Sequence, residues 1–273
     1  MDLATKYRVE PGSKVDLKDW KTDDADGVDR AWASQRLAEN TEAMRFLQNR
    51  LYAEKKQSLL VVLQAMDTAG KDSTIRHVFG PLNPAGVRVT PFGRPTDEEL
   101  GHDFLWRIHQ HTPQRGFIQI FNRSHYEDVL VVRVNDLVPK KVWQERYDII
   151  NAFEHSLNES NTRVVKIYLN LSRDRQREKL AERLTTPHKQ WKFEIADLAT
   201  RRRWHDYMKA YEHAITKCNT SDAPWYIVPT DRKWFRLAAV SEIIRAELER
   251  MDPQFPDADV DPKTAMRELD SIG

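Results

Sequence analysis

Residues 59–76 constrain the fold of this chain more than any other stretch. They open with five consecutive apolar residues, and such a run is typical of a parallel strand that is buried on both faces. A turn of small residues follows and ends in Gly70-Lys71, and residues 72–76 then have the composition of the first turn of a helix. In this arrangement, backbone N–H groups and the positive end of the helix surround an oxyanion, as in a phosphate-binding loop. The stretch therefore predicts an α/β domain with a phosphate site at the end of one strand.

This loop departs from the standard pattern G-x-x-x-x-G-K-[ST] at two positions. Ala65 replaces the first glycine, and Asp72 stands where a magnesium-binding hydroxyl is expected, with Ser73 and Thr74 one and two places later. The loop also contains Asp67, and a carboxylate among phosphate-binding amides is unfavourable unless a cation accompanies it. Asp67 is therefore predicted to be a metal ligand. The alternative is a simple strand-to-helix turn with a surface lysine.

The composition allows a large folded domain and limits the classes of partner. With 273 residues, of which 40% are hydrophobic and 31% charged, one domain with appendages is expected. The formal net charge is +1, so a polyanionic partner would need a local basic surface. The single cysteine, Cys218, excludes an intramolecular disulfide. Because we find neither a signal-peptide core nor a run that could cross a membrane, we expect a cytoplasmic protein without a membrane partner.

The chain divides into an arm, a core domain and a tail. We expect residues 1–28 to form an irregular arm, 29–252 the core domain and 253–273 a mostly extended tail. The expected strands are 59–63, 87–90, 116–121, 164–169 and 224–229, and the expected helices include 30–55, 72–78, 96–111 and 140–157. This alternation predicts a three-layer α/β/α domain with a five-stranded, mainly parallel sheet.

Local polar residues suggest how two of the helices begin. Thr96 is expected to cap a helix that continues to about residue 111, and Asp231 is expected to cap the last helix of the core. Three histidines, His102, His109 and His111, lie close together in the first of these helices. We expect them to be solvated side chains rather than metal ligands.

A second group of candidate site residues follows the third strand. Asn122 and Arg123 come directly after it, and Glu127 and Asp128 follow one turn into the next helix. Because open α/β sheets bind ligands outside the carboxyl ends of their strands, this segment should face the phosphate loop. The planar fork of Arg123 suits phosphate oxygens. A surface ion pair at a helix end is the alternative role for Arg123.

Residues 173–203 break the charge balance of the chain, with ten basic side chains against five acidic ones. The segment is interrupted at residues 185–187 between two helical stretches. In nucleotide and nucleoside kinases, a basic helical hairpin at this point closes over the phosphates as a lid and brings arginines to the transferred group. We therefore expect a helical lid of about these bounds. A solvated helical face with several ion pairs is the alternative.

Five segments of the chain together resemble the polyphosphate kinase 2 family. They are AMDTAGKDSTI (65–75), PTDEELGHDFLWRIH (95–109), GFIQIFNRSHYEDVLVVRV (116–134), HKQWKFEIADLATRRRWHDY (188–207) and APWYIVPTDRKWFR (223–236). The resemblance implies a P-loop kinase fold and phosphoryl transfer between inorganic polyphosphate and nucleotides. It also implies Mg²⁺ as the cofactor, with Mn²⁺ as an alternative. In this family, Ala65 and Asp72 are normal at their positions.

The resemblance also implies roles for individual residues. Asp67 would hold the metal at the point of transfer, while Lys71, Arg123 and Arg183 would bind phosphate. Asn122 together with Glu127 is similar to the subgroup that phosphorylates nucleoside monophosphates as well as diphosphates. The expected catalytic residues are Asp67, Lys71, Asn122, Arg123 and Glu127. The expected phosphate- and nucleotide-binding residues are Thr68, Ala69, Gly70, Asp72, Ser73, Arg183, Lys189 and Lys192. The basic channel for polyphosphate is expected to include Lys189, Lys192 and residues 201–203.

From these implications we expect a reversible enzyme that transfers the terminal phosphoryl group of polyphosphate to ADP and to AMP by direct in-line attack. The expected partners are polyphosphate, AMP, ADP and ATP, with guanine nucleotides as further candidates, and other copies of the chain in a homodimer or homotetramer. No nucleic-acid partner is expected. Two other functions stay open: an ATP-dependent nucleoside or nucleotide kinase, and a non-catalytic polyanion-binding module. Asp67 and Lys71 together argue against the second, because passive binding needs no metal ligand in the loop.

Overall fold

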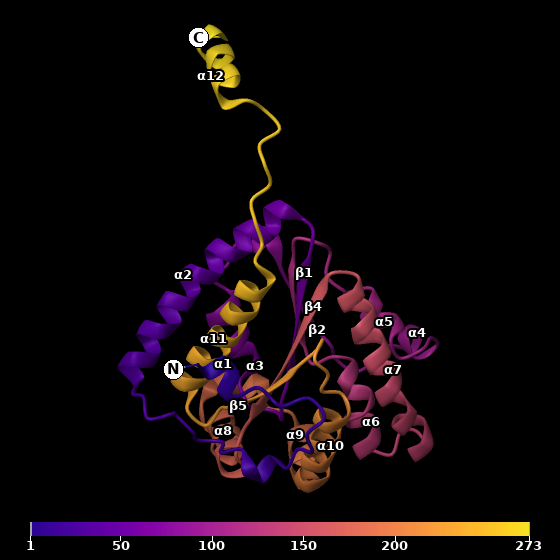
Figure 1. The fold of residues 1–273 in the computed structure, drawn as a ribbon. Coiled ribbons are helices and arrows are strands. Elements are labelled where there is room, and N and C mark those ends of the chain that lie inside the picture. Colours follow the sequence, from indigo (N-terminus) through magenta and orange to yellow (C-terminus); the bar gives the residue numbers. More distant parts are fainter. Residues whose placement is uncertain (1, 273) are drawn as a thin grey trace.

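A five-stranded sheet forms the centre of the molecule (Figure 1). The structure, a computed structural model, describes residues 2–272. The strands are β1 (Ser58–Gln64), β2 (Val87–Pro91), β3 (Ile118–Asn122), β4 (Thr162–Asn170) and β5 (Trp225–Pro229). Their order is β2-β3-β1-β4-β5 and every pairing is parallel, so Val61 of β1 lies between Ile120 of β3 and Val165 of β4. The five predicted strands are confirmed.

Helices cover both faces of this sheet. One face packs against α2 (Arg30–Glu54) and α11 (Lys233–Met251), and the other against α7 (Lys140–Glu159) and α10 (Trp204–Lys217). Successive residues of β1 point to opposite faces, so Leu59, Val61 and Leu63 enter one core while Leu60 and Val62 enter the other. All five are fully buried, which contributes about 1.5–3 kcal/mol for each side chain. The predicted three-layer α/β/α fold is confirmed.

The helix after the phosphate loop is short and changes its winding. It starts as α3 (Lys71–Thr74) and continues as one π-helical turn, η2 (Ile75–Phe79). It ends at Gly80, directly before Pro81, as the sequence predicted. A 3₁₀ turn, η3 (Pro84–Gly86), then leads into β2.

The predicted single helix over residues 96–111 is wrong. Thr96 does cap a helix, in a capping box with Glu99, but this helix is only α4 (Asp97–Leu100). The Asp103 carboxylate accepts the Leu105 backbone N–H at 2.9 Å and opens a new turn, from which α5 (Trp106–His109) follows. His102 stacks on Trp106, while His109 and His111 lie edge-on against Phe153 and Phe92.

Two further predictions near the C-terminus are corrected by tertiary contacts and local capping. Asp231 does not cap α11; its carboxylate accepts the Ser172 backbone N–H and the Thr22 hydroxyl instead. The tail is extended only over residues 252–261, and then forms α12 (Pro262–Ile272). This helix begins with Pro262. The carboxylate of Asp261 before it accepts the backbone N–H groups of Lys263 and Thr264. Figure 1 shows α12 beyond the rest of the domain, and its residues are exposed.

The N-terminal arm lies along one edge of the sheet. It contains α1 (Leu3–Lys6) and η1 (Leu17–Asp19). The backbone N–H of Val9 donates to the Trp225 carbonyl, and that of Ile227 donates to the Tyr7 carbonyl, each at 2.9 Å. The arm thus pairs with β5, which would otherwise present unpaired backbone groups.

Within residues 2–272, none of the helices combines the length and the apolar character needed to cross a membrane.

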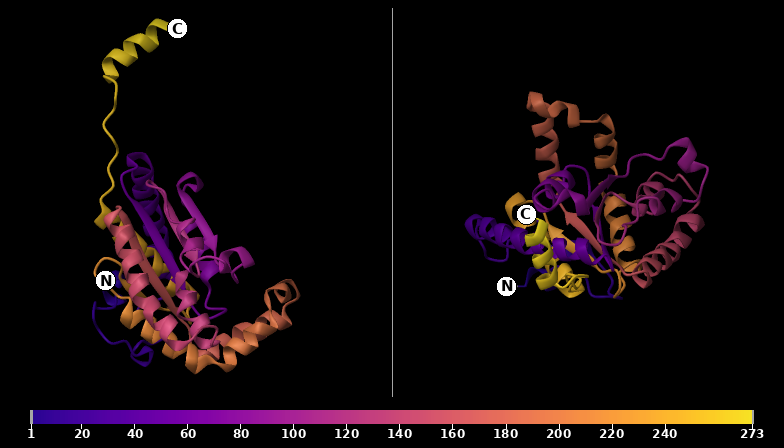
Figure 2. Two further views of the ribbon diagram at one scale, coloured as in Figure 1. Left: turned by 90° about the vertical axis from the view of Figure 1, so that its right-hand side faces the viewer. Right: turned by 90° about the horizontal axis from the view of Figure 1, so that it is seen from above.

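The basic segment 173–203 forms a helical hairpin, which we call the basic hairpin. It consists of α8 (Arg173–Thr185), η5 (Pro187–Lys192) and α9 (Ile195–Arg202), so the predicted interruption before Pro187 is confirmed. Ser172 caps α8 by accepting the Arg175 N–H. Figure 2 shows the basic hairpin extending outward from the domain. Two short elements, η4 (His125–Asp128) and α6 (Val131–Val134), join β3 to α7.

Candidate active site

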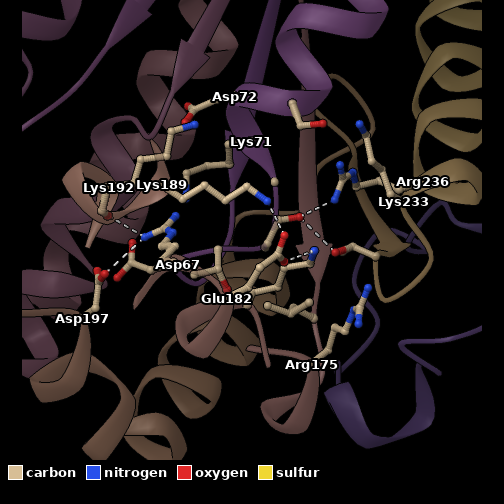
Figure 3. A pocket seen from close by; sticks show the side chains of 18 of the residues that line it. Asp67, Lys71, Asp72, Arg175, Glu182, Lys189, Lys192, Asp197, Lys233 and Arg236 are labelled. Atoms are coloured by element: carbon tan, nitrogen blue, oxygen red, sulfur yellow. Dashed lines mark hydrogen bonds and ion pairs between the residues drawn. The ribbon is translucent and has the colours of Figure 1, made fainter. Parts of the chain in front are cut away.

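The carboxyl ends of four strands open into one cavity of about 690 Å³ (Figure 3). Its floor is the loop after β1, which the end of β3 and the end of β5 flank from opposite sides of the sheet, and the basic hairpin after β4 also lines it. Ten basic and six acidic side chains line it: Lys71, Arg76, Arg123, Arg175, Lys179, Arg183, Lys189, Lys192, Lys233 and Arg236, and Asp67, Asp72, Glu182, Glu194, Asp197 and Asp231. The cavity therefore has a local excess of positive charge that the net charge of the chain does not reveal.

The loop after β1 has a backbone that few side chains would tolerate. Gly70 has φ +100° and Thr68 has φ +71°. A left-handed conformation at a β-branched residue such as Thr68 costs on the order of 1–3 kcal/mol and is typical of functional sites. The Ala69 carbonyl is held from β5 and α11, because it accepts hydrogen bonds from Arg236 Nη1 at 2.7 Å and from Thr230 Oγ1 at 3.1 Å.

Lys71 lies at the base of the loop. Its Nζ donates to the Ala65 carbonyl at 3.1 Å, and within residues 2–272 this is its only hydrogen bond. Burial lowers the pKa of Lys71, although the charge of Asp67 opposes this shift. An ammonium group has three donors, so Lys71 keeps N–H groups that can bind a phosphate oxygen.

Asp67 and Arg123 connect the two loops. Arg123 Nη2 donates to Asp67 Oδ1 at 2.9 Å, and Arg123 is itself in the left-handed region with φ +64°. Burial would lower the pKa of the Arg123 guanidinium, but the charges of Glu127 and Asp67 outweigh it and raise the pKa. Burial raises the pKa of Glu127, which is close enough to Arg123 and Lys71 to feel both charges although it does not line the cavity.

The end of β3 also contacts the first turn of α3. Asn122 Nδ2 donates to Asp72 Oδ1 at 2.8 Å, and both residues line the cavity. Two hydroxyl oxygens, Thr68 Oγ1 in the loop and Ser73 Oγ in the first turn of α3, are buried without a hydrogen-bond partner among the described residues. Such unpaired buried oxygens are rare in folded proteins and are therefore available to a ligand.

The basic hairpin contributes three of the predicted binding residues. Arg183, Lys189 and Lys192 all line the cavity. Arg183 Nη1 pairs with Asp197 Oδ2 at 3.2 Å and donates to the Lys192 carbonyl at 2.9 Å. Lys189 pairs with Glu182, and Lys192 Nζ lies 5.0 Å from the centre of the Trp191 ring.

Residues 201–203, predicted for the basic channel, do not line the cavity. Arg201 Nη1 instead donates to the Arg173 carbonyl at 2.7 Å and to Gln176 Oε1 at 3.0 Å, which ties α9 to α8. Arg203 pairs with Asp206 at 3.2 Å. The basic run winds around a helix, so only part of it can face the cavity, and the role of residues 201–203 in a polyphosphate channel stays a prediction.

Comparison with known proteins identifies the family. A family model described as "Polyphosphate kinase 2 (PPK2)" matches residues 27–256. The chain belongs to the polyphosphate kinase 2 family. The chain is 47% identical over 266 residues to the AMP/ADP-polyphosphate phosphotransferase of Meiothermus ruber. The alignment covers 97% of this chain and 98% of the relative.

Other relatives agree with this assignment, and the predicted family is confirmed. The chain is 41% identical over 275 residues to the ADP-polyphosphate phosphotransferase of Rhodopseudomonas palustris, with 94% of each protein covered. Among solved structures, polyphosphate kinase 2 from Arthrobacter aurescens TC1 superposes with a TM-score of 0.95 at 39% identity and covers 100% of this chain and 98% of that one.

The sequence analysis did not predict several of the basic residues that line the cavity. Lys233 and Arg236 lie at the start of α11, and burial lowers the pKa of Arg236 to about 10. The signal was present: both follow the fifth strand, where ligands bind in open α/β sheets, and a spacing of three residues places them on one helix face. Arg76, Arg175 and Lys179 were also missed.

The loop suits a magnesium ion that is shared with a substrate. Within residues 2–272, no group of three or more His, Cys, Asp or Glu side chains could hold a metal by itself. Mg²⁺ in kinases is usually bound by one or two carboxylates, water and the substrate phosphates. Asp67, with the unpaired hydroxyl oxygens of Thr68 in the same loop and Ser73 at the start of α3, fits that arrangement.

Proposed function

We propose that this PPK2 kinase transfers the terminal phosphoryl group of inorganic polyphosphate to ADP and to AMP, reversibly. The observation that carries the proposal is the lining of the cavity, because basic side chains continue from the phosphate loop along the start of α11 and into the basic hairpin. A single phosphate group would contact only a few of them, whereas an extended polyanion can contact many. The name of the Meiothermus ruber relative supports polyphosphate, AMP and ADP, and that of the Rhodopseudomonas palustris relative supports polyphosphate and ADP.

In the proposed reaction, the chain positions charged groups around the transferred phosphoryl. Lys71 would donate to its oxygens from the loop, and Arg123 would donate from the end of β3, so both stabilise negative charge that spreads over these oxygens. Asp67 would hold Mg²⁺, or Mn²⁺ in its place, with Thr68 and Ser73 beside it, and the bound cation would offset phosphate charge.

We further propose that the nucleotide phosphate attacks directly and that no covalent enzyme intermediate forms. Among the described residues, no histidine or cysteine lines the cavity. Cys218 is buried elsewhere, where burial raises the pKa of its thiol to about 12. A phosphorylated enzyme trapped with polyphosphate in the absence of an acceptor would refute direct transfer.

The end of β3 is the proposed position of the acceptor nucleotide. Asn122 donates to Asp72 there, while Glu127 lies close enough to Arg123 and Lys71 to feel both charges. We propose that this arrangement admits AMP as well as ADP, and that guanine nucleotides are further acceptors. The other proposed binding residues are Ala69, Gly70, Arg183, Lys189 and Lys192.

The basic hairpin is proposed to close over the phosphates as a lid, so that water is excluded during transfer. Its helices extend outward from the domain and touch the loop through a hydrogen bond from Gln176 Nε2 to the Asp67 carbonyl at 3.3 Å. We also propose the division of the chain into an arm (residues 1–28), a core domain (29–252) that includes the lid (about 173–203), and a tail (253–273). We also propose a homodimer or homotetramer that acts in the cytoplasm.

One incubation tests the reaction. The purified protein is mixed with Mg²⁺, polyphosphate and AMP without ATP, and the nucleotides are separated by chromatography. ADP followed by ATP is the expected result, and Asp67→Asn should abolish both. If AMP is inert but ADP supplied in its place becomes ATP, only the AMP assignment fails. If neither reacts while ATP phosphorylates another acceptor, the enzyme is an ATP-dependent kinase.

A further inference from the structure

Four of the five basic residues of the basic hairpin that line the cavity are already paired with carboxylates of the hairpin itself; Lys192 is the exception among residues 2–272. Glu182 accepts a hydrogen bond from Lys179 Nζ at 2.8 Å through Oε2 and pairs with Lys189 through Oε1. Both oxygens of one carboxylate are thus occupied by lysines that face the cavity. These two ion pairs lower the pKa of Glu182 to about 2. Figure 3 shows Glu182 among the side chains that surround this space.

The opposite side of the cavity lacks this compensation. Arg76 and Lys233 make no ion pair with another side chain of residues 2–272. Burial and the neighbouring charges of Arg236 and Arg76 lower the pKa of Lys233, as expected where cations gather without a carboxylate. An arriving polyanion therefore finds free cations near α11 but must compete with a carboxylate for Lys179 and Lys189.

Glu182 has no second role that would explain its place. Asp197, which pairs with Arg183, also closes the capping box of α9 with Glu194 and so stabilises that helix. Glu182, in contrast, accepts hydrogen bonds from the two lysines alone among residues 2–272, and its side chain is 40% exposed. It can swing into water without breaking a backbone contact.

We propose that Glu182 is an internal competitor of the phosphate chain: it holds Lys179 and Lys189 until polyphosphate displaces it, and so limits the affinity of the lid for polyphosphate. This proposal rests on the proposed function. A chain that is shortened at its end must move through the site after each transfer, and a lid whose lysines were all unpaired would hold it more tightly. Glu182 therefore sets a balance between holding the donor and releasing it.

Glu182→Gln should tighten polyphosphate binding about three- to ten-fold, because each of two exposed ion pairs contributes only a small free energy and both are removed. Binding should also depend more steeply on salt, since two more lysines become available to the polyanion. The KM for polyphosphate should fall, whereas the KM for AMP should stay unchanged.

The experiment measures the Kd of end-labelled polyphosphate by fluorescence anisotropy, without nucleotide, at several salt concentrations. Asp174→Asn is the matched control, because Asp174 is exposed on the same helix, outside the cavity, and its substitution removes the same charge. It should leave the Kd within about two-fold of the wild-type value, the size expected for one distant screened charge. Glu182→Ala should tighten binding as Glu182→Gln does, because alanine cannot accept hydrogen bonds from the lysines.

Unchanged or weaker binding in both Glu182 variants would overturn the inference, because it would mean that Glu182 orients the lysines for the substrate. The inference also fails if Asp174→Asn tightens binding equally, since the effect would then be one of net charge. If the wild-type protein neither binds nor consumes polyphosphate, the proposed function itself fails. If it does both and only the expected tightening is missing, the proposed function stands.

Discussion

The most direct test of the role of the phosphate loop is the substitution Gly70→Ala, which adds a single methyl group. A Cβ atom built on this residue would lie 2.6 Å from the guanidinium carbon of Arg236, and the backbone has φ +100°. The conformation alone costs an L-residue about 1–2 kcal/mol. Arg236 would also have to leave the Ala69 carbonyl, a charged hydrogen bond of 2.7 Å that is worth about 1.5–3 kcal/mol.

These two contributions predict that Gly70→Ala lowers the free energy of unfolding by about 2.5–5 kcal/mol and distorts the loop that would hold the phosphoryl group. We expect turnover of AMP or ADP with polyphosphate to fall by at least about 100-fold, because small displacements of positioning groups cost that much. Urea unfolding monitored by circular dichroism gives the first quantity, and nucleotide chromatography gives the second.

Two other glycines separate the causes. Gly12 has φ +77° but no atom within 4 Å of a built Cβ, so Gly12→Ala should show only the conformational cost. Gly93 has neither feature, and Gly93→Ala should be close to neutral. If Gly70→Ala is no more destabilising than Gly12→Ala, the contact with Arg236 does not hold the loop. Full activity in Gly70→Ala would refute the assignment of this loop to the reaction.

Three further predictions concern other parts of the molecule. Asp67→Asn should lower turnover by more than about 100-fold while polyphosphate binding persists, because the basic side chains stay in place; wild-type turnover would contradict its role. Lys166→Met should lower the free energy of unfolding by about 3–5 kcal/mol in urea, since Glu154, which lies 2.5 Å from Lys166 Nζ in the buried core, would lose its lysine and keep only its hydrogen bonds with Tyr126 and His125. Burial raises the pKa of Asp128 from 3.8 to about 6, so the folded state binds more protons than the unfolded chain between these values and loses stability as pH rises through them. Asp128→Asn should remove this component, at most about 3 kcal/mol, from urea unfolding measured between pH 4 and 7; an unchanged slope would refute it.

The sequence was sufficient to predict an element wherever the residues that determine it lie within one short stretch. The apolar run before the loop predicted β1, because a strand buried on both faces needs apolar residues at every position. Thr96 formed the expected helix cap, in a capping box with Glu99, since both partners lie within one turn. The interruption before Pro187 followed from the missing N–H and fixed φ of proline.

Predictions failed where a side chain found a distant partner or another local one. Asp231 was expected to cap the nearest helix, but it bonds Ser172 and Thr22, which approach only when β4 and the N-terminal arm are in place. The contact between Arg201 and the Arg173 carbonyl was likewise not predictable, because it forms only where two helices fold against each other. The helix after Thr96 ended early because Asp103 offered its own backbone a competing hydrogen bond.

The amino-acid sequence by itself determined the strands, the parallel sheet and the position of the phosphate loop, because each depends on residues that are neighbours in the chain. Only the tertiary structure decided how that loop is held and how its cavity is charged. Arg236, which follows β5, donates to the Ala69 carbonyl in the loop after β1. Arg123, which follows β3, donates to Asp67 in the same loop. Such contacts join residues far apart in the chain, and they exist only after the sheet has brought the strand ends together.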